Sequence, residues 1–123
     1  MAMQREQSIL MEKSEAFTGR ILKLHKYLLQ QKHEKTCSSQ VVRSGTSIGA
    51  NISESRNAQS TADFIHKLSI ALKEADETLY WLKSLHNGGY LNDKEFESIY
   101  NDADELVKML VSSIKTLKRK IGK

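Results

Sequence analysis

Hydrophobic side chains return at helical spacing along three long segments, at about residues 7–31, 61–86 and 93–120. In the first segment they are separated by seven, four, three and four residues, which places them on one side of a helix. The three stripes are Leu10, Phe17, Ile21, Leu24 and Leu28; then Phe64, Leu68, Ala71, Ala75, Thr78, Leu82 and Leu85; then Phe96, Tyr100, Ala103, Val107, Leu110, Ile114, Leu117 and Ile121. The pattern predicts three amphipathic helices, each with one buried side.

Residues 39–55 form a weaker helical pattern between the first two of these segments. Glycines at 45 and 49 and several β-branched residues make a poor isolated helix. Such a segment is helical only if tertiary packing holds it, and its small residues allow another backbone to approach closely. A flexible loop is the alternative. The predicted inner side consists of Val41, Gly45, Ile48 and Ile52.

Capping and turn signals separate these segments. Ser60 is suited to cap the helix that follows it, and Asn92 with Glu95 has the spacing of a capping box. A polar stretch at 31–38 and a glycine pair at 88–89 read as connections. Four helices with short connections predict an all-α fold, an antiparallel up-down-up-down four-helix bundle.

Composition narrows the class of protein. A length of 123 residues suits one domain over residues 1–123, and the absence of proline suits long uninterrupted helices. The single cysteine, Cys37, forms no internal disulfide and suits a reducing compartment. No apolar run approaches the roughly 18 residues that span a bilayer, and residues 1–10 lack the apolar core of a signal peptide. We expect a cytoplasmic helical protein with no membrane partner.

Three of the predicted helices carry a second pattern on the side that faces away from the core. Exposed apolar side chains among them would form a patch that needs covering, which predicts a homo-oligomer interface. There Arg43 and Glu54 would pair across subunits, and Ser47 and Asn51 would hydrogen-bond. Scattered apolar residues on a monomer are the alternative. The pattern comprises Met11, Thr18, Leu22 and Leu29; Arg43, Ser47, Asn51 and Glu54; and Ile70, Glu74, Glu77 and Trp81.

The sequence contains one incomplete metal-binding motif and one cysteine without the neighbours of a catalytic nucleophile. Asp63 and His66 form one acid-x-x-His pair, whereas a di-metal bundle needs paired motifs and further carboxylates. Cys37 falls in the expected loop beside Lys35, without the His and Asn that would activate it. We therefore expect no catalytic residue, no metal and no cofactor. The histidines, interpreted as surface groups, are His25, His33, His66 and His86.

Arg20 and His25 have the Arg-x(4–6)-His spacing of the helical HEPN ribonucleases, in which two subunits bring these groups to a phosphate. Arginine would stabilise the charge and histidine would move a proton. In that family the motif lies on a late helix, whereas here it lies on the first. Because the spacing matches, an HEPN-like ribonuclease is a second alternative function.

A basic stripe near the end of the chain is the main binding candidate. The net charge is +4, and residues 63–123 carry ten basic and ten acidic residues. In the last helix Lys108, Lys115 and Arg119 are separated by seven and four residues, and Lys118, Lys120 and Lys123 extend the stripe. Multivalent contact with phosphates would be strongly salt-dependent, and no aromatic residues lie beside the stripe to stack bases. The pattern predicts non-specific nucleic-acid binding; a solvated helix end is the alternative.

Residues 40–54, with the sequence QVVRSGTSIGANISE, resemble the signature of the 23S rRNA intervening-sequence proteins. The matching positions are Gln40, Arg43, Ser47-Ile48 and Asn51-Ile52-Ser53-Glu54, with Asp63-Phe64, Leu68, Ile70, Ala71 and Gly89-Tyr90-Leu91 further along the chain. Ser55 follows the signature glutamate where the family often has glycine.

The resemblance implies a left-handed four-helix bundle that assembles as a ring, typically a homopentamer, in the bacterial cytosol. A related accessory protein of diversity-generating retroelements partners a reverse transcriptase and binds nucleic acid. The family supplies no catalytic residue. The sequence thus favours a non-enzymatic oligomeric protein that binds RNA, in preference to DNA. A protein-interaction module, for example a reverse-transcriptase partner, is the alternative.

Overall fold

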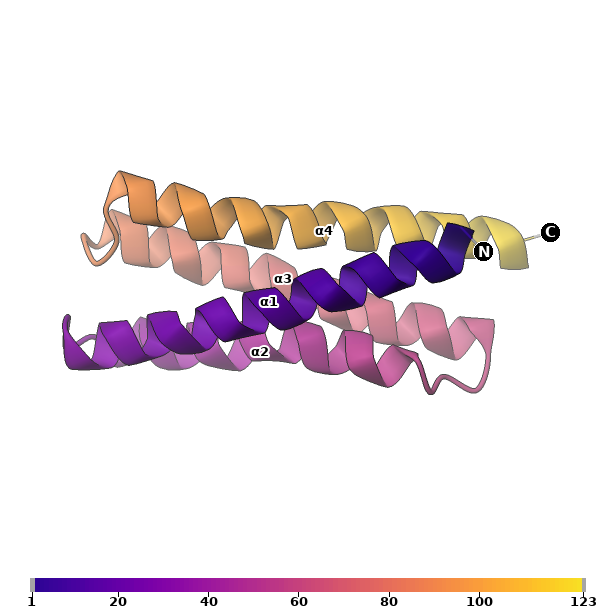
Figure 1. Ribbon diagram of the computed structural model, residues 1–123, viewed down its shortest axis with the longest axis horizontal. Helices are drawn as coiled ribbons and strands as arrows, with labels where there is room; N and C mark the ends of the chain where they lie inside the picture. The colour runs from indigo at the N-terminus through magenta and orange to yellow at the C-terminus, as the bar shows by residue number, and fades with distance from the viewer. Residues whose placement is uncertain (1, 123) are drawn as a thin grey trace.

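The structure, a computed structural model, describes residues 2–122, with side-chain positions for residues 5–122. That part of the chain forms four helices and no strand: α1 (Ala2–Gln30), α2 (Thr36–Ser55), α3 (Thr61–Asn87) and α4 (Asp93–Ile121). The connections alternate between the two ends of the molecule, and both termini lie at the same end (Figure 1). Each helix packs against two others, because α1 contacts both α2 and α4, and α3 contacts both α2 and α4. None of the described helices combines the length and apolarity that crossing a membrane requires.

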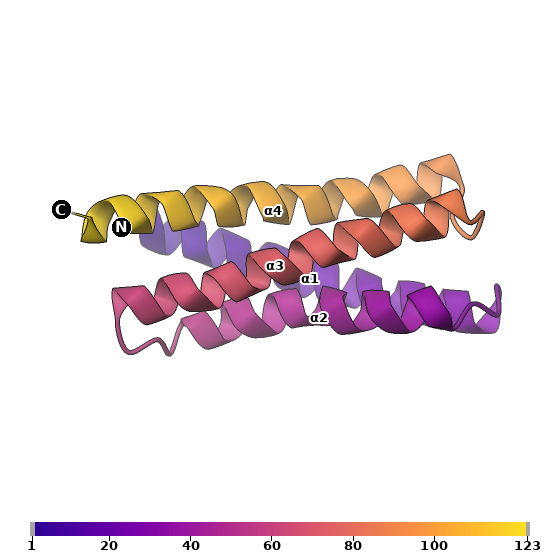
Figure 2. The same cartoon turned by 180° about the vertical axis from the view of Figure 1, so that it is seen from behind.

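The helices are tilted relative to one another. The first turns of α3 lie against α2 and its last turns against α4, as the view from behind shows (Figure 2). Similarly, α1 starts beside α4 and moves away from it toward α2 (Figure 1). Contact between α1 and α4 is therefore the least extensive of the four helix pairs. This tilt leaves the two helices apart near the end where α4 begins.

The core follows the predicted stripes closely. Phe17, Ile21, Leu68 and Leu82 are among the fully buried side chains. The prediction differs in α4, where Ile99 and Leu106 are buried and Val107 is only partly covered. Ile121 is 53% exposed, because the last turn of α4 extends past its neighbours (Figures 1 and 2).

Residues of the weak helical segment form a continuous helix, so the loop alternative is wrong. The helix α2 begins at Thr36, whereas the sequence predicted a loop as far as residue 38. Glu34 explains the earlier start: its carboxylate oxygens accept hydrogen bonds from the backbone N–H groups of Cys37 and Ser38, at 3.1 and 2.8 Å. A carboxylate at this position satisfies free N–H groups and complements the positive end of the helix. The preceding residue, His33, has a left-handed backbone conformation, with φ of 55°.

The predicted caps of the other two helices are present. Ser60 accepts a hydrogen bond from the Asp63 N–H at 3.0 Å. Asn92 and Glu95 form the reciprocal capping box, with bonds of 2.8 and 2.9 Å. At the same turn His86 stacks on Phe96, with ring centroids 4.3 Å apart. These contacts hold the end of α3 against the start of α4.

Candidate functional site: two polar surfaces on the bundle

The outward side of α2 presents the residues of the QVVRSGTSIGANISE signature. Arg43 and Glu54 are exposed and Ser47 is partly exposed, whereas Val41 and Ile48 on the opposite side are buried. This confirms that the signature has one inner and one outer side. We refer to the outer residues, together with Glu74, Glu77 and Trp81 of α3, as the signature face; its α2 members are Gln40, Arg43, Ser47, Asn51 and Glu54.

Arg43 links α2 to α3 within the chain. Its guanidinium forms ion pairs with Glu74, at 3.3 Å, and with Glu77. The Trp81 indole N–H also donates to Glu77, at 3.2 Å, and the Gln40 amide oxygen accepts from the Arg43 Nε at 3.4 Å. A single exposed ion pair contributes about 0–1 kcal/mol, so this network orients side chains more than it stabilises the fold.

The predicted pairing of Arg43 with Glu54 joins two subunits and stays a prediction; within one chain the carboxylate partners of Arg43 lie on α3. Arg43 already has two carboxylate partners on α3, and within the described residues Glu54 forms no ion pair. Ser47 and Asn51 bond along their own helix, Ser47 Oγ to the Arg43 carbonyl at 2.7 Å and Asn51 Nδ2 to the Ser47 carbonyl at 2.8 Å. Their side chains therefore lie along α2 and do not project far from it, so this part of the surface is flat.

The apolar residues of the predicted interface fall into two groups. Leu22 and Leu29 on α1 are 51% and 37% exposed, as predicted. Ile70 and Trp81 on α3 are only partly exposed, which corrects the expectation that they are free. Trp81 packs against the core, and its indole N–H bonds to Glu77 one turn earlier on α3. Tyr80, which the periodicity did not single out, is 62% exposed and meets the Trp81 ring edge-on.

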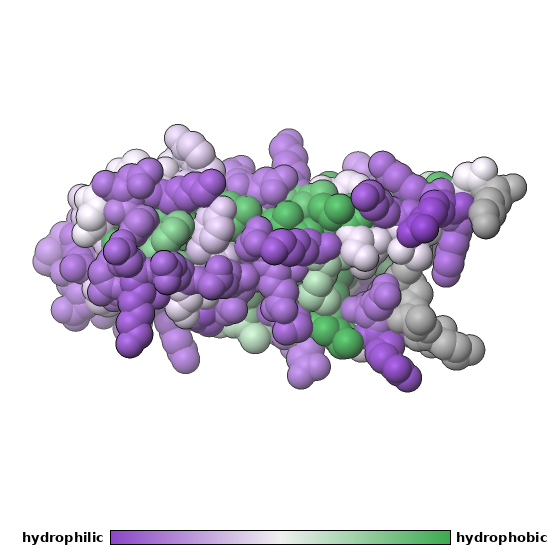
Figure 3. Space-filling view, turned by 90° about the horizontal axis from the view of Figure 1, so that it is seen from above, coloured by the Kyte–Doolittle hydropathy of each residue, from purple (hydrophilic) through white to green (hydrophobic). Residues whose placement is uncertain are grey.

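The basic stripe lies on the last turns of α4. We call Lys115, Lys118, Arg119 and Lys120 the basic end: all four are exposed, and none forms an ion pair with a described residue. They lie at the same end of the bundle as the start of α1 (Figure 1). Viewed from the α4 side, hydrophilic side chains cover most of the visible surface, and separate apolar patches lie between them (Figure 3).

Two members of the predicted stripe stand apart from it. Lys108 forms an ion pair with Asp104 at 3.1 Å, so its charge is partly neutralised. Lys120 lies about 140° around the helix from Lys115, at about 100° per residue, so it faces a different side. Lys123 lies outside the described residues.

Arg20 and His25 point toward different helices. The Arg20 guanidinium pairs with Asp102 of α4 at 2.6 Å and donates to the backbone carbonyl and the hydroxyl of Ser98. His25 Nδ1 instead lies 2.6 Å from the Ser38 hydroxyl of α2. Within one chain the two side chains therefore do not converge on a shared phosphate site.

Cys37 lies in the first turn of α2 and not in the loop that the sequence predicted. Burial, and next the negative charge of Glu34, raise the pKa of the Cys37 thiol. A raised pKa leaves less thiolate at neutral pH, which makes this cysteine a weak nucleophile.

Two histidines interpreted as surface groups have structural partners. His25 bonds to Ser38, and His86 lies 2.7 Å from an Asp93 carboxylate oxygen while stacking on Phe96. In residues 2–122 no group of three or more His, Cys, Asp or Glu side chains is placed to hold a metal ion. The Asp63 carboxylate accepts from the Gln59 N–H at 3.2 Å, where it supports the start of α3.

The fold and the signature face together define a four-helix-bundle protein with a conspicuous polar side on its second helix. The chain belongs to the 23S rRNA-intervening sequence protein family, whose model matches residues 6–112. It is similar to a crystal structure from Bacteroides thetaiotaomicron VPI-5482, described as a protein of unknown function from the S23 ribosomal protein family. The two are 50% identical with a TM-score of 0.88, over 89% of this chain and 98% of that one. A comparison with curated proteins gives no match.

Proposed function

We propose that the protein is a non-enzymatic, oligomeric RNA-binding protein of the cytoplasm, and that it contacts phosphates through the basic end of α4. The observation that carries the proposal is the set of exposed cations without acidic partners among the described residues, Lys115, Lys118, Arg119 and Lys120. Unpaired cations are available to phosphates, whereas Lys108 already has a carboxylate partner.

Assembly would turn a weak contact into a useful one. A few lysines on one chain neutralise few phosphates, and the affinity gained from released counterions grows with the number of contacts. We infer a left-handed bundle that forms a ring, a homopentamer by family resemblance. A +4 chain would then give an assembly with a charge of about +20, and one RNA strand could contact several basic ends at once.

The chemistry of the basic end supports binding without sequence preference. Lysine and arginine at a helix end contact the backbone, whereas reading bases needs contacts to base edges or stacking aromatics. No Phe, Trp or Tyr follows Tyr100 in the sequence of α4. Membership of a family named for sequences within 23S rRNA favours RNA over DNA as the ligand.

A salt titration tests this function. Fluorescence anisotropy would measure binding of a labelled single-stranded RNA and of the DNA of the same sequence, from low to high salt. We expect submicromolar RNA binding that weakens steeply with salt, with a slope that falls by about 0.7 per lost phosphate contact on a single strand. Absence of binding at low salt would contradict the proposal.

A matched pair of variants locates the surface. Replacing Lys115, Lys118 and Arg119 with Glu should abolish RNA binding without changing the oligomer size. The control replaces the exposed cations Lys26, Lys35 and Lys73 with Glu, which changes the net charge equally. Equal loss of binding in both variants would mean that net charge alone, and not the basic end, determines binding.

A protein-interaction module is the second candidate function. The signature face favours it, because Arg43, Glu77 and Trp81 form an oriented polar network on a flat surface, with exposed Leu22 and Leu29 on the neighbouring helix. An intact oligomer that binds neither nucleic acid at low salt would support this candidate over RNA binding.

A further inference from the structure

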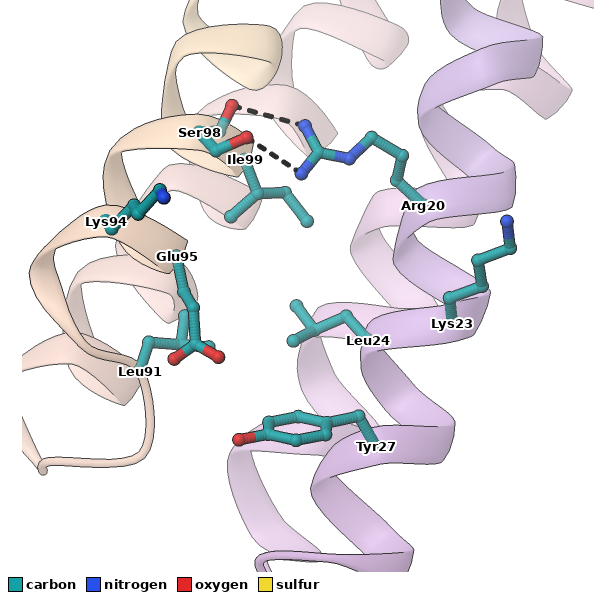
Figure 4. Close-up of a pocket in the computed structure, with 9 residues that line it drawn as sticks. All are labelled: Arg20, Lys23, Leu24, Tyr27, Leu91, Lys94, Glu95, Ser98 and Ile99. Carbon is teal, nitrogen blue, oxygen red and sulfur yellow. Dashed lines mark hydrogen bonds between the residues drawn. The ribbon is translucent and has the colours of Figure 1, made fainter.

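A groove separates α1 from α4 near the end of the bundle where α4 begins. It has a volume of about 540 Å³. Leu24 and Tyr27 point into it from α1, and Leu91 and Ile99 lie across from them (Figure 4). Leu91 and Ile99 are each 4% exposed and form the buried floor of the groove, whereas Leu24 and Tyr27 are partly exposed.

The groove lies where a series of ion pairs between the two helices stops. Lys13 pairs with Glu105 at 3.2 Å, and Arg20 pairs with Asp102 at 2.6 Å. Beyond Arg20, where α1 moves away from α4, no ion pair links the two helices among the described residues. The groove therefore results from the tilt between α1 and α4. The ion pairs between the two helices mark one end of it.

The charges at the groove favour an acidic occupant. Lys23 on α1 and Lys94 on α4 stand at its outer edges (Figure 4), and neither forms an ion pair with a described residue. Arg20 is neutralised by Asp102. Glu95 is the acidic lining residue; one of its oxygens accepts from the Asn92 N–H at the positive end of α4. Lys23 and Lys94 therefore flank an apolar floor, and together with the Glu95 carboxylate they leave the groove with a net positive charge.

We propose that this groove is the docking site for a short, acidic amphipathic helix of another protein. One or two large apolar side chains of that helix would cover Leu24 and Tyr27 above the floor of Leu91 and Ile99, and carboxylates on its flanks would pair with Lys23 and Lys94. A helix in a groove between two helices is a recurrent mode of peptide recognition.

Titration with two synthetic peptides tests the proposal. The first is an amphipathic helical peptide with Leu and Phe on one face and Glu on both flanks; the second carries Lys in place of each Glu. We expect the acidic peptide alone to bind in fluorescence anisotropy and to shift the NMR methyl signals of Leu24, Leu91 and Ile99. No binding, or equal binding of both peptides, would overturn the proposal.

Variants on exposed residues separate the groove from the rest of the surface. Lys23→Glu with Lys94→Glu should weaken binding of the acidic peptide at least about tenfold, about 1.4 kcal/mol. The control, Lys26→Glu with Lys73→Glu, has the same net charge and leaves the groove intact, so it should bind as the unmodified chain does. Equal weakening in both variants would contradict docking at the groove.

Two further outcomes would assign the groove to another occupant. If Lys23→Glu with Lys94→Glu reduced the oligomer size, the occupant would be a second copy of this chain. If single-stranded RNA displaced the acidic peptide from the groove, the occupant would be nucleic acid. Either result would overturn the peptide proposal, whereas the variants at Lys115, Lys118 and Arg119 test the basic end, which lies at the opposite end of α4.

Discussion

The backbone of Gly45 on α2 lies directly against the Ile21 side chain on α1. A Cβ atom placed on Gly45 would come within 2.9 Å of both Cγ1 and Cγ2 of Ile21. Those atoms are attached to the Ile21 Cβ and lie in a fully buried side chain, so they cannot turn away as the end of a lysine could. The two helices can approach this closely only because position 45 has no side chain.

Gly45→Ala should therefore destabilise the protein despite its better helix propensity. Alanine gains about 1 kcal/mol in helix propensity, whereas overpacking a core costs about 1–3 kcal/mol. Urea denaturation measures the difference. Gly19→Ala is the matched control, because nothing lies within 4 Å of a Cβ at position 19, and it should stabilise. A Gly45→Ala protein as stable as Gly19→Ala would contradict the packing.

Glu34→Ala should destabilise α2 at its start. The change leaves the N–H groups of Cys37 and Ser38 without their acceptor, and losing a cap costs about 1 kcal/mol. Denaturation by urea compares it with Glu12→Ala, which removes an exposed carboxylate from α1. Hydrogen exchange at Ser38 should speed up only in the Glu34 variant; unchanged exchange there would show that the cap contributes nothing.

Arg43→Ala should alter assembly more than folding if the signature face is the subunit interface that the sequence predicts. The exposed ion pairs contribute less than about 1 kcal/mol to the chain itself, so its unfolding should change little. Analytical ultracentrifugation should show a smaller particle. Arg56→Ala, which removes an exposed arginine at the end of α2, serves as the control. An Arg43→Ala protein with the original sedimentation would rule out this arginine as an interface residue.

Cys37 should react slowly with iodoacetamide while the protein is folded. Its raised pKa reduces the thiolate at neutral pH, so alkylation measured by mass spectrometry should be faster in urea. The same shift makes the free energy of unfolding depend on pH. Because the Cys37 pKa is higher in the folded state, the thiol stabilises the fold at pH values below its unfolded pKa. That contribution is lost as the pH rises through the alkaline range. Cys37→Ser should remove this alkaline loss; a curve unchanged by the substitution would contradict it.

Local signals account for most of the fold that could be predicted. The apolar spacing of Phe17, Ile21 and Leu82 depends only on helix geometry, and each of these side chains is buried. The bonds at Ser60 and at Asn92 involve residues three positions apart, so they too could be predicted. The start of α2 could not be predicted, because glutamate is not a usual cap. The position of Glu34 also depends on the left-handed backbone of His33.

The candidate surfaces divide in the same way. By itself the sequence determined which side of each helix faces outward, and so it placed Arg43, Leu22 and the basic end correctly on the surface. Only the tertiary structure decided that Arg43 pairs with Glu74 and Glu77, and that α1 leaves α4 to open a groove beside Leu24. The physical reason is that a repeat along one helix is local, whereas partners on another helix depend on the tilt and rotation between helices. Packing of the whole bundle sets that geometry.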